Sequence, residues 1–232
     1  MQPPLPIYCE TAHPMSFGSF VIAEPVNFFT NVFILIAALA ATRLLLRRRA
    51  ATAGQWLLVI LLFMTAFGSF AWHGVRTPFT LALDGWSGVA FLIVLIGVWI
   101  EGLCGRWVGV FGALGFVVLA VASFIAGFRG AALIGGELVH RFVFVPFFVL
   151  VTIFGLMLIA ATGRRNASAA RVGVYALICG LIAATGRSVD LFTCGWLPFG
   201  SHFLWHLFLS LAAYLALVML TGLTRPGGWA RG

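Results

Sequence analysis

The sequence predicts an all-α integral membrane protein built as a bundle of seven transmembrane helices. Of its 232 residues, 62% are hydrophobic and only 9% are charged, and the mean hydropathy is +1.10. A soluble domain is typically about one quarter charged, so this composition excludes that class. Apolar stretches of nearly the length that crosses a bilayer recur along the whole chain.

Seven apolar stretches are expected to be membrane spans, and short segments rich in arginine, glycine or proline separate them. In chain order they are residues 22–45, 55–73, 79–101, 107–127, 139–162, 170–187 and 200–223. Residues 1–21 are expected to form an extramembrane segment. The first twenty residues lack the basic residues of a signal peptide, so the first span should be retained. With no linker, convincing repeat or soluble domain visible, residues 1–232 are expected to form one seven-span domain.

The arginines predict how the chain is oriented in the membrane. All fourteen basic residues are arginine and the net charge is +8. An outside N-terminus and a cytoplasmic C-terminus place most of them on the cytoplasmic side, as the positive-inside rule requires. No basic patch interleaved with aromatic residues indicates binding to nucleic acid. The cytoplasmic set is Arg43, Arg47, Arg48, Arg49, Arg106, Arg164, Arg165, Arg171, Arg225 and Arg231, against Arg76, Arg129, Arg141 and Arg187.

Three histidines form a candidate metal site. His202 and His206 open the last span four residues apart, so both imidazoles lie on one helix face. The second span runs outward and ends near His73, while the seventh runs inward from His202. The three histidines should therefore lie at similar depth, toward the non-cytoplasmic face. Three histidines are the ligand set of a catalytic zinc site that keeps one open position.

Two further polar residues near His73 would complete a hydrolytic site. Zinc lowers the pKa of a bound water to about 7, and the reaction then needs a base and an oxyanion donor. Asp84 is the candidate base, and Ser69, one turn before His73, is the candidate donor. The alternatives are that Ser69 bonds its own helix and that Asp84 caps a helix or pairs with Arg76. The histidine pair could instead bind haem or simply pack at the interface.

The order of these motifs resembles the alkaline ceramidases, members of a superfamily of seven-span membrane hydrolases that includes the adiponectin-receptor-like proteins. The shared order is Ser-x3-His, an aspartate eleven residues later, and HxxxH at the start of the last span. Further matches are YCE (8–10) to the family's WCE and IAEPVNFFTN (22–31) to its IAE-x2-N-x3-N segment. SVDLFTC (188–194) is similar to the end of its sixth span, and HFLWH (202–206) keeps its tryptophan.

The resemblance implies that His73, His202 and His206 bind zinc. It implies that Asp84 orients or deprotonates the zinc-bound water and that Ser69 stabilises the tetrahedral oxyanion. The implied enzyme hydrolyses the amide of ceramide or a similar N-acyl lipid to a sphingoid base and a fatty acid. Alternatives are a hydrolase of a different N-acyl lipid, a receptor or binding protein with a structural zinc, and a b-type cytochrome.

The resemblance also implies a calcium site beside the zinc region. Glu10, Glu24 and the backbone carbonyl of Tyr8 fall at calcium-ligand positions. The match is incomplete, because Ile7 and Ala12 stand where the family has Asp and Asn. Calcium takes six to eight oxygen ligands, mostly from acids. A structural role for Glu24 together with the two asparagines that follow it is the alternative.

The resemblance further implies a disulfide between Cys9 and Cys194. Both cysteines lie on the outer face in the expected topology, which is an oxidising compartment if this face is a bacterial periplasm. The protein would then be a multi-pass protein of the bacterial inner membrane, with its active site toward the non-cytoplasmic face and membrane lipids around it.

Other polar residues receive structural interpretations. Asp190 is expected to form an ion pair with Arg187 near the end of the sixth span. Glu137 and His140 are expected to pair with Arg141 at the membrane edge, and contact with a lipid headgroup is the alternative.

Overall fold

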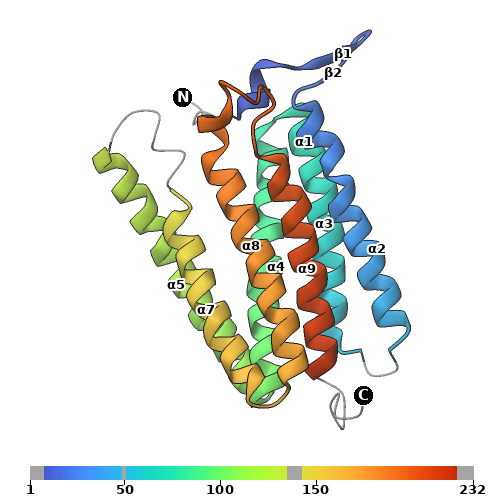
Figure 1. The fold of residues 1–232 in the computed structure, drawn as a ribbon, viewed down its shortest axis with the longest axis vertical. Helices are drawn as coiled ribbons and strands as arrows, with labels where there is room; N and C mark the ends of the chain where they lie inside the picture. The colour runs from blue at the N-terminus through green and yellow to red at the C-terminus, as the bar shows by residue number, and fades with distance from the viewer. Residues whose placement is uncertain (1–7, 49–50, 135–142, 224–232) are drawn as a thin grey trace.

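The computed structural model describes residues 8–48, 51–134 and 143–223. Within these ranges, seven helical segments are long and apolar enough to cross a membrane, which confirms the predicted seven-span helical architecture (Figure 1). Glu137 and His140 lie outside the described residues. The start of the predicted span 139–162 also lies outside them.

The elements follow one another along the chain as a short N-terminal region and a series of long helices. They are η1 (Cys9–Ala12), β1 (Met15–Phe17), β2 (Phe20–Ile22), α1 (Pro25–Thr30), α2 (Val32–Leu46), α3 (Ala53–Val75), α4 (Pro78–Cys104), α5 (Arg106–Ile134), α7 (Val145–Gly163), α8 (Ala167–Thr193) and α9 (Phe203–Leu223).

The N-terminal segment contains an antiparallel hairpin that the sequence analysis did not predict. Strand β1 pairs with β2, and Phe17 lies opposite Phe20 across the turn. The hairpin lies at the end of the bundle that carries the N-terminus, whereas the C-terminal end of α9 lies at the opposite end (Figure 1). The same N-terminal region covers the start of α9 and therefore frames the site described below.

The first span is two helices and not one. Helix α1 ends at Thr30 and α2 begins at Val32, with Asn31 between them. The Asn31 side chain donates to the Asn27 carbonyl oxygen at 2.9 Å. The last residue of the short helix α1, Thr30, contacts His206 at the start of α9.

Local capping residues explain where α3 and α4 begin. Thr52 accepts a hydrogen bond from the backbone N–H of Gln55 in a capping box, and Thr77 does the same for Thr80 at the start of α4. Pro78 occupies the first turn of α4, where a missing N–H costs nothing. The turn between the helices consists of Arg76 and Thr77, and Arg76 adopts a left-handed conformation with φ of 49°.

The hydrophobic core lies between α2, α3, α4 and α9. Ala38, Leu58, Trp99 and Leu217 are among its buried members, one from each helix. This packing holds α3 beside α9, and it brings the end of α3 to the same level as the start of α9.

The predicted ion pair between Asp190 and Arg187 is wrong, as is the predicted end of the sixth span at residue 187. Helix α8 continues to Thr193. The Arg187 guanidinium lies 4.1 Å from the ring centroid of Phe144 and 5.6 Å from that of Trp205. Aromatic faces attract cations and can carry an arginine within a span, so the helix is not interrupted there. Asp190 accepts backbone N–H groups instead.

Candidate metal centre

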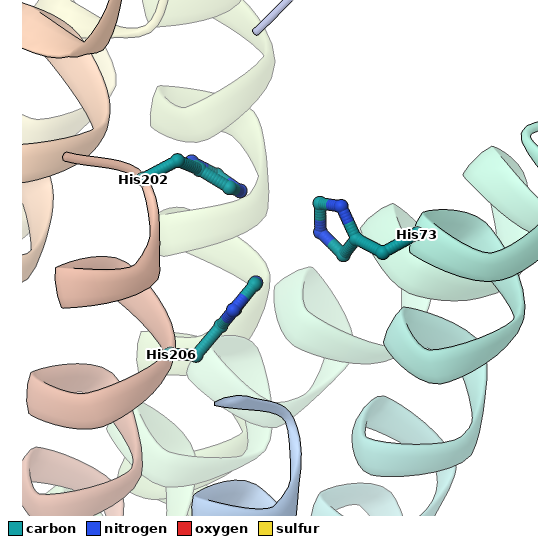
Figure 2. Close-up of side chains that lie close together, drawn as sticks. All are labelled: His73, His202 and His206. Atoms are coloured by element: carbon teal, nitrogen blue, oxygen red, sulfur yellow. The ribbon is translucent and has the colours of Figure 1, made fainter. Parts of the chain in front are cut away.

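Three buried histidines from two helices converge at one end of the bundle. His73 lies in the last turn of α3, His202 directly precedes α9, and His206 lies in its first turn (Figure 2). One ligand nitrogen from each ring lies within 4.8 Å of the others. The ring centroids are 4.8 to 5.2 Å apart. The three side chains are at most 2% exposed, so the predicted grouping of these histidines is present in the structure.

Each ring has a buried nitrogen without a hydrogen-bond partner. These atoms are Nε2 of His73, Nδ1 of His202 and Nε2 of His206. A buried imidazole nitrogen that lacks a partner is costly unless something binds it. A metal ion is a ligand that suits three buried imidazoles whose ring nitrogens lie this close together. The close mutual packing of the rings favours one ion over a haem, which would separate two axial histidines by a macrocycle.

Glu24 contacts the far side of the His73 ring. Its Oε2 lies 2.5 Å from His73 Nδ1. Glu24 directly precedes α1 and is fully buried. The backbone strengthens this placement, because the Glu24 N–H donates to the His73 carbonyl oxygen at 3.0 Å. A carboxylate at Nδ1 favours the tautomer that has its proton there, which leaves the Nε2 lone pair for a metal.

Thr30 does the same for His206. The Thr30 hydroxyl lies 2.9 Å from His206 Nδ1 and donates to the backbone carbonyl of Val26 at 2.8 Å. If the single hydroxyl proton stays in that bond, the oxygen accepts from the Nδ1–H of His206. The Nε2 of this ring, which has no hydrogen-bond partner, is then free to bind a metal ion.

His202 is held by stacking and through its backbone. The Tyr8 ring stacks on the His202 ring with centroids 4.1 Å apart. Burial raises the pKa of the Tyr8 hydroxyl, which stays neutral at physiological pH. Asp190 Oδ1 accepts the backbone N–H groups of Ser201 and His202 at 2.7 and 2.8 Å. The loop between α8 and α9 is thereby fixed directly before the histidine.

The disulfide Cys9–Cys194 is present and links the N-terminal segment to the end of α8. Asp190 Oδ2 also accepts the backbone N–H of Cys9 at 2.9 Å. Gly200 has a φ of 69°, and a Cβ there would come 2.8 Å from the Cys9 Cβ. Only glycine fits this position, and the N-terminal segment can therefore approach the α8–α9 loop closely.

Ser69 and Asp84 lie together at the contact between α3 and α4. The Ser69 side chain is buried and lies near enough to the Asp84 carboxyl group to affect it electrostatically. Asp84 is partly exposed. A Cβ on Gly68 would lie 2.9 Å from the backbone carbonyl of Leu83, so the glycine permits the close helix approach. Among the described residues, Asp84 is not part of the group of metal-ligand atoms, and its carboxyl group is available for another role.

The acids that resembled calcium ligands have other partners. Both Glu10 oxygens accept backbone N–H groups at the start of α1, from Val26 and from Asn27 at 2.9 Å. Burial raises the pKa of Glu10, and these two N–H groups oppose the shift. Glu24 uses Oε1 for Arg76 and Thr11 and Oε2 for His73. Because these oxygens are already paired with donors, the described carboxylates do not fit a calcium site.

Sequence reasoning missed several residues that shape the centre. The Tyr8 ring, Thr30 and Thr11 carry no motif that separates them from ordinary polar or aromatic residues. Arg76 was considered as a partner of Asp84, whereas the structure pairs it with Glu24. The importance of Glu24 could be inferred from the sequence, because a carboxylate at the edge of a membrane span needs a buried partner.

A comparison with protein families supports the resemblance seen in the motifs. The family model named Ceramidase matches residues 8–226, which is nearly the whole chain and includes the three histidines, Ser69 and Asp84. A search of curated proteins returned no match. Because the family model matches nearly the whole chain, including the three histidines, this chain belongs to the ceramidase family.

Proposed function

We propose that the protein is a zinc-dependent intramembrane hydrolase that cleaves the amide bond of ceramide or a similar N-acyl lipid. The family supports this substrate class. The observation that carries the proposal is the group of three buried histidines with unpartnered ring nitrogens. Three imidazoles are the protein ligand set of catalytic zinc, which keeps a position open for chemistry.

A zinc ion held by His73, His202 and His206 would supply Lewis-acid activation of water and of the amide carbonyl. Asp84 accepts the proton of the attacking water. The bond between the carbonyl carbon and the amide nitrogen then breaks, and Asp84 returns the proton to the leaving amine. The products are a sphingoid base and a fatty acid.

The contact between Ser69 and Asp84 suits this proton transfer. While Asp84 is a carboxylate, the nearby Ser69 hydroxyl can donate a hydrogen bond to it. Once Asp84 has taken the proton, it no longer needs that donor. The Ser69 hydroxyl can then donate to the oxyanion that develops on the amide carbonyl. The oxyanion is thereby stabilised at the step in which its negative charge forms.

The centre faces the non-cytoplasmic side in this proposal. Among the described arginines, seven lie at the bundle end that carries the C-terminal end of α9 and three lie at the end of the histidines. The positive-inside rule places the first end in the cytoplasm. The disulfide Cys9–Cys194 at the histidine end agrees, because such bonds persist in oxidising compartments.

The proposal is tested with the purified protein in detergent, incubated with several N-acyl lipids with and without a zinc chelator. Released fatty acid is measured by mass spectrometry and bound metal by elemental analysis. We expect about one zinc per chain, as a single three-histidine site holds one ion, and hydrolysis that stops on zinc removal. His206→Ala should lower both metal content and hydrolysis.

His13→Ala is the matched control, because His13 is exposed in the N-terminal segment and away from the triad. It should keep the metal content and the rate of the unmodified protein. Hydrolysis that persists after complete removal of zinc would contradict the proposal, as would a protein that binds zinc and hydrolyses none of the N-acyl lipids.

A further inference from the structure

The carboxylate behind His73 is itself held by a cation from the same chain. Glu24 Oε1 forms an ion pair with Arg76 and accepts the Thr11 hydroxyl at 2.7 Å. Its Oε2 lies 2.5 Å from His73 Nδ1. Glu24 therefore connects a guanidinium group on one side to a metal-site histidine on the other.

Two contacts and one backbone angle determine where the Arg76 guanidinium group lies. Its NH1 group donates to the Thr11 hydroxyl at 2.9 Å, which ties it to the N-terminal segment. Its Cζ lies 4.7 Å from the ring centroid of Trp72 in α3. The Arg76 backbone adopts φ of 49°, a left-handed conformation that is unfavourable for a residue with a Cβ. Such an outlier points to a requirement for this side chain in this direction.

The arrangement has an electrostatic reason. A buried carboxylate is costly unless a cation and hydrogen-bond donors compensate it. Arg76 and Thr11 supply both at Oε1, and Oε2 is left to the imidazole. Outer partners of a metal-binding histidine orient its ring and affect metal affinity, even though they do not touch the ion.

We propose that Arg76 is a positioning residue, a built-in cation that holds Glu24 against His73 and thereby raises the zinc affinity of the triad. The inference rests on the proposed zinc site. It also accounts for the poor fit of calcium, because the guanidinium group already provides the positive charge beside Glu24. Zinc binding should accordingly be independent of free calcium.

The test measures zinc affinity of the full-length protein in detergent, by competition with a chromogenic zinc chelator. Loss of an outer partner typically lowers metal affinity about 10- to 100-fold, and we expect this for Glu24→Gln and for Arg76→Ala. The double variant should bind zinc no more weakly than Glu24→Gln, because both changes break the same connection. Arg43→Gln is the control, an exposed arginine in α2.

Two further measurements distinguish a positioning role of Arg76 from a general loss of structure in its variant. Millimolar guanidinium should restore part of the zinc affinity of Arg76→Ala and should not affect the Arg43→Gln control. Calcium, or a calcium-selective chelator that spares zinc, should leave the zinc affinity of the unmodified protein unchanged. If Arg76→Ala does not fold, Arg76→Lys replaces it and should bind zinc more weakly than the unmodified protein, since lysine lacks the guanidinium fork.

The outcomes distinguish this inference from the proposed function. An unmodified protein that binds no zinc overturns both. Normal zinc affinity in the Arg76 variant, losses that multiply in the double variant, or zinc affinity that depends on calcium would overturn the role of Arg76 alone. Reduced affinity that guanidinium restores, with no further loss in the double variant, supports it.

Discussion

At the scale of single residues, the centre depends on which ring nitrogen each histidine presents. Glu24 and Thr30 contact the Nδ1 atoms of His73 and His206, and the opposite nitrogens have no partner. Neither partner belongs to the histidine motifs in the sequence. Both come from the region around α1, so the segment before the first long helix contributes directly to the metal centre.

Asp84 provides a test of mechanism that leaves the metal ligands intact. Asp84→Asn should lower the rate of lipid hydrolysis about 10²- to 10⁴-fold, the usual contribution of a general base, because an amide does not accept the proton. Zinc content should stay unchanged, since Asp84 lies outside the ligand group among the described residues. The measurements are fatty acid release and elemental analysis on the same preparation.

Glu101→Gln is the control for this experiment, because Glu101 lies exposed toward the far end of the same helix α4. It should leave the rate unchanged. Full hydrolase activity in Asp84→Asn would remove Asp84 from the mechanism. Retained lipid binding without any hydrolysis in the unmodified protein would instead favour a receptor with a structural zinc.

At the scale of elements, the contact between α3 and α4 decides where Asp84 lies. Gly68 lets the backbone at Leu83 approach α3, and Ser69 directly follows that glycine. A side chain at position 68 would push the start of α4 away from Ser69. The proposed catalytic pairing of Ser69 and Asp84 therefore depends on the absence of a side chain at Gly68 as well as on the two polar groups.

Gly68→Ala should reduce hydrolysis and spare zinc. Its Cβ would meet the Leu83 carbonyl at 2.9 Å, so α4 must shift. A displacement near 1 Å at a catalytic group can lower a rate about 10²-fold. Gly85→Ala is the matched control, because a Cβ there meets no atom within 4 Å. Equal rates for the two variants, measured by fatty acid release, would contradict this role of the α3–α4 contact.

Element ends were the least predictable feature of the helices. Arg187 and Asp190 suggested that the sixth span stops early, but α8 continues past both. The Phe144 ring, directly before α7, and the Trp205 ring of α9 cover the arginine. The N–H groups of a loop and of the N-terminal segment satisfy the aspartate. A charged residue ends a span only when no neighbour compensates it, and the neighbours come from other helices.

At the scale of the whole molecule, an odd number of spans places the two ends of the described chain on opposite sides of the membrane. The hairpin lies at one end of the bundle, and the C-terminal end of α9 lies at the other (Figure 1). The histidine triad lies at the hairpin's end, because it is formed at the end of α3 and the start of α9. The expected orientation, with the triad outside, is open to a direct test through a native cysteine.

Cys104 reports the orientation because it is exposed at the end of α4 opposite the triad. Cys9 and Cys194 form a disulfide and Cys179 is buried, so Cys104 is the accessible thiol of the described residues. A membrane-impermeant maleimide should label it only after the cells are permeabilised. Ser16→Cys in the exposed hairpin should be labelled in intact cells.

Cys104→Ser provides the background for this labelling, which mass spectrometry reads out. Labelling of Cys104 in intact cells, together with protection of the Ser16→Cys thiol, would reverse the orientation. The triad would then face the cytoplasm, and the disulfide would require an explanation other than an oxidising compartment.

The sequence by itself determined the features that depend on local composition and on motif order. Hydropathy specified seven spans, because bilayer crossing requires long apolar stretches. The spacing of His202 and His206 placed two imidazoles on one face, and alternating span direction brought His73 to their level. The resemblance of the motifs also anticipated the disulfide that the structure contains.

Only the tertiary structure decided which partners the polar groups have. Glu24 resembled a calcium ligand in the sequence, but the left-handed turn at Arg76 directs a guanidinium group to it. Asp190 resembled half of an ion pair, but the loop before α9 and the N-terminal segment present three N–H groups to it. A buried charge is stabilised by whichever donors the fold brings within hydrogen-bond distance, and these donors lie far away in the sequence.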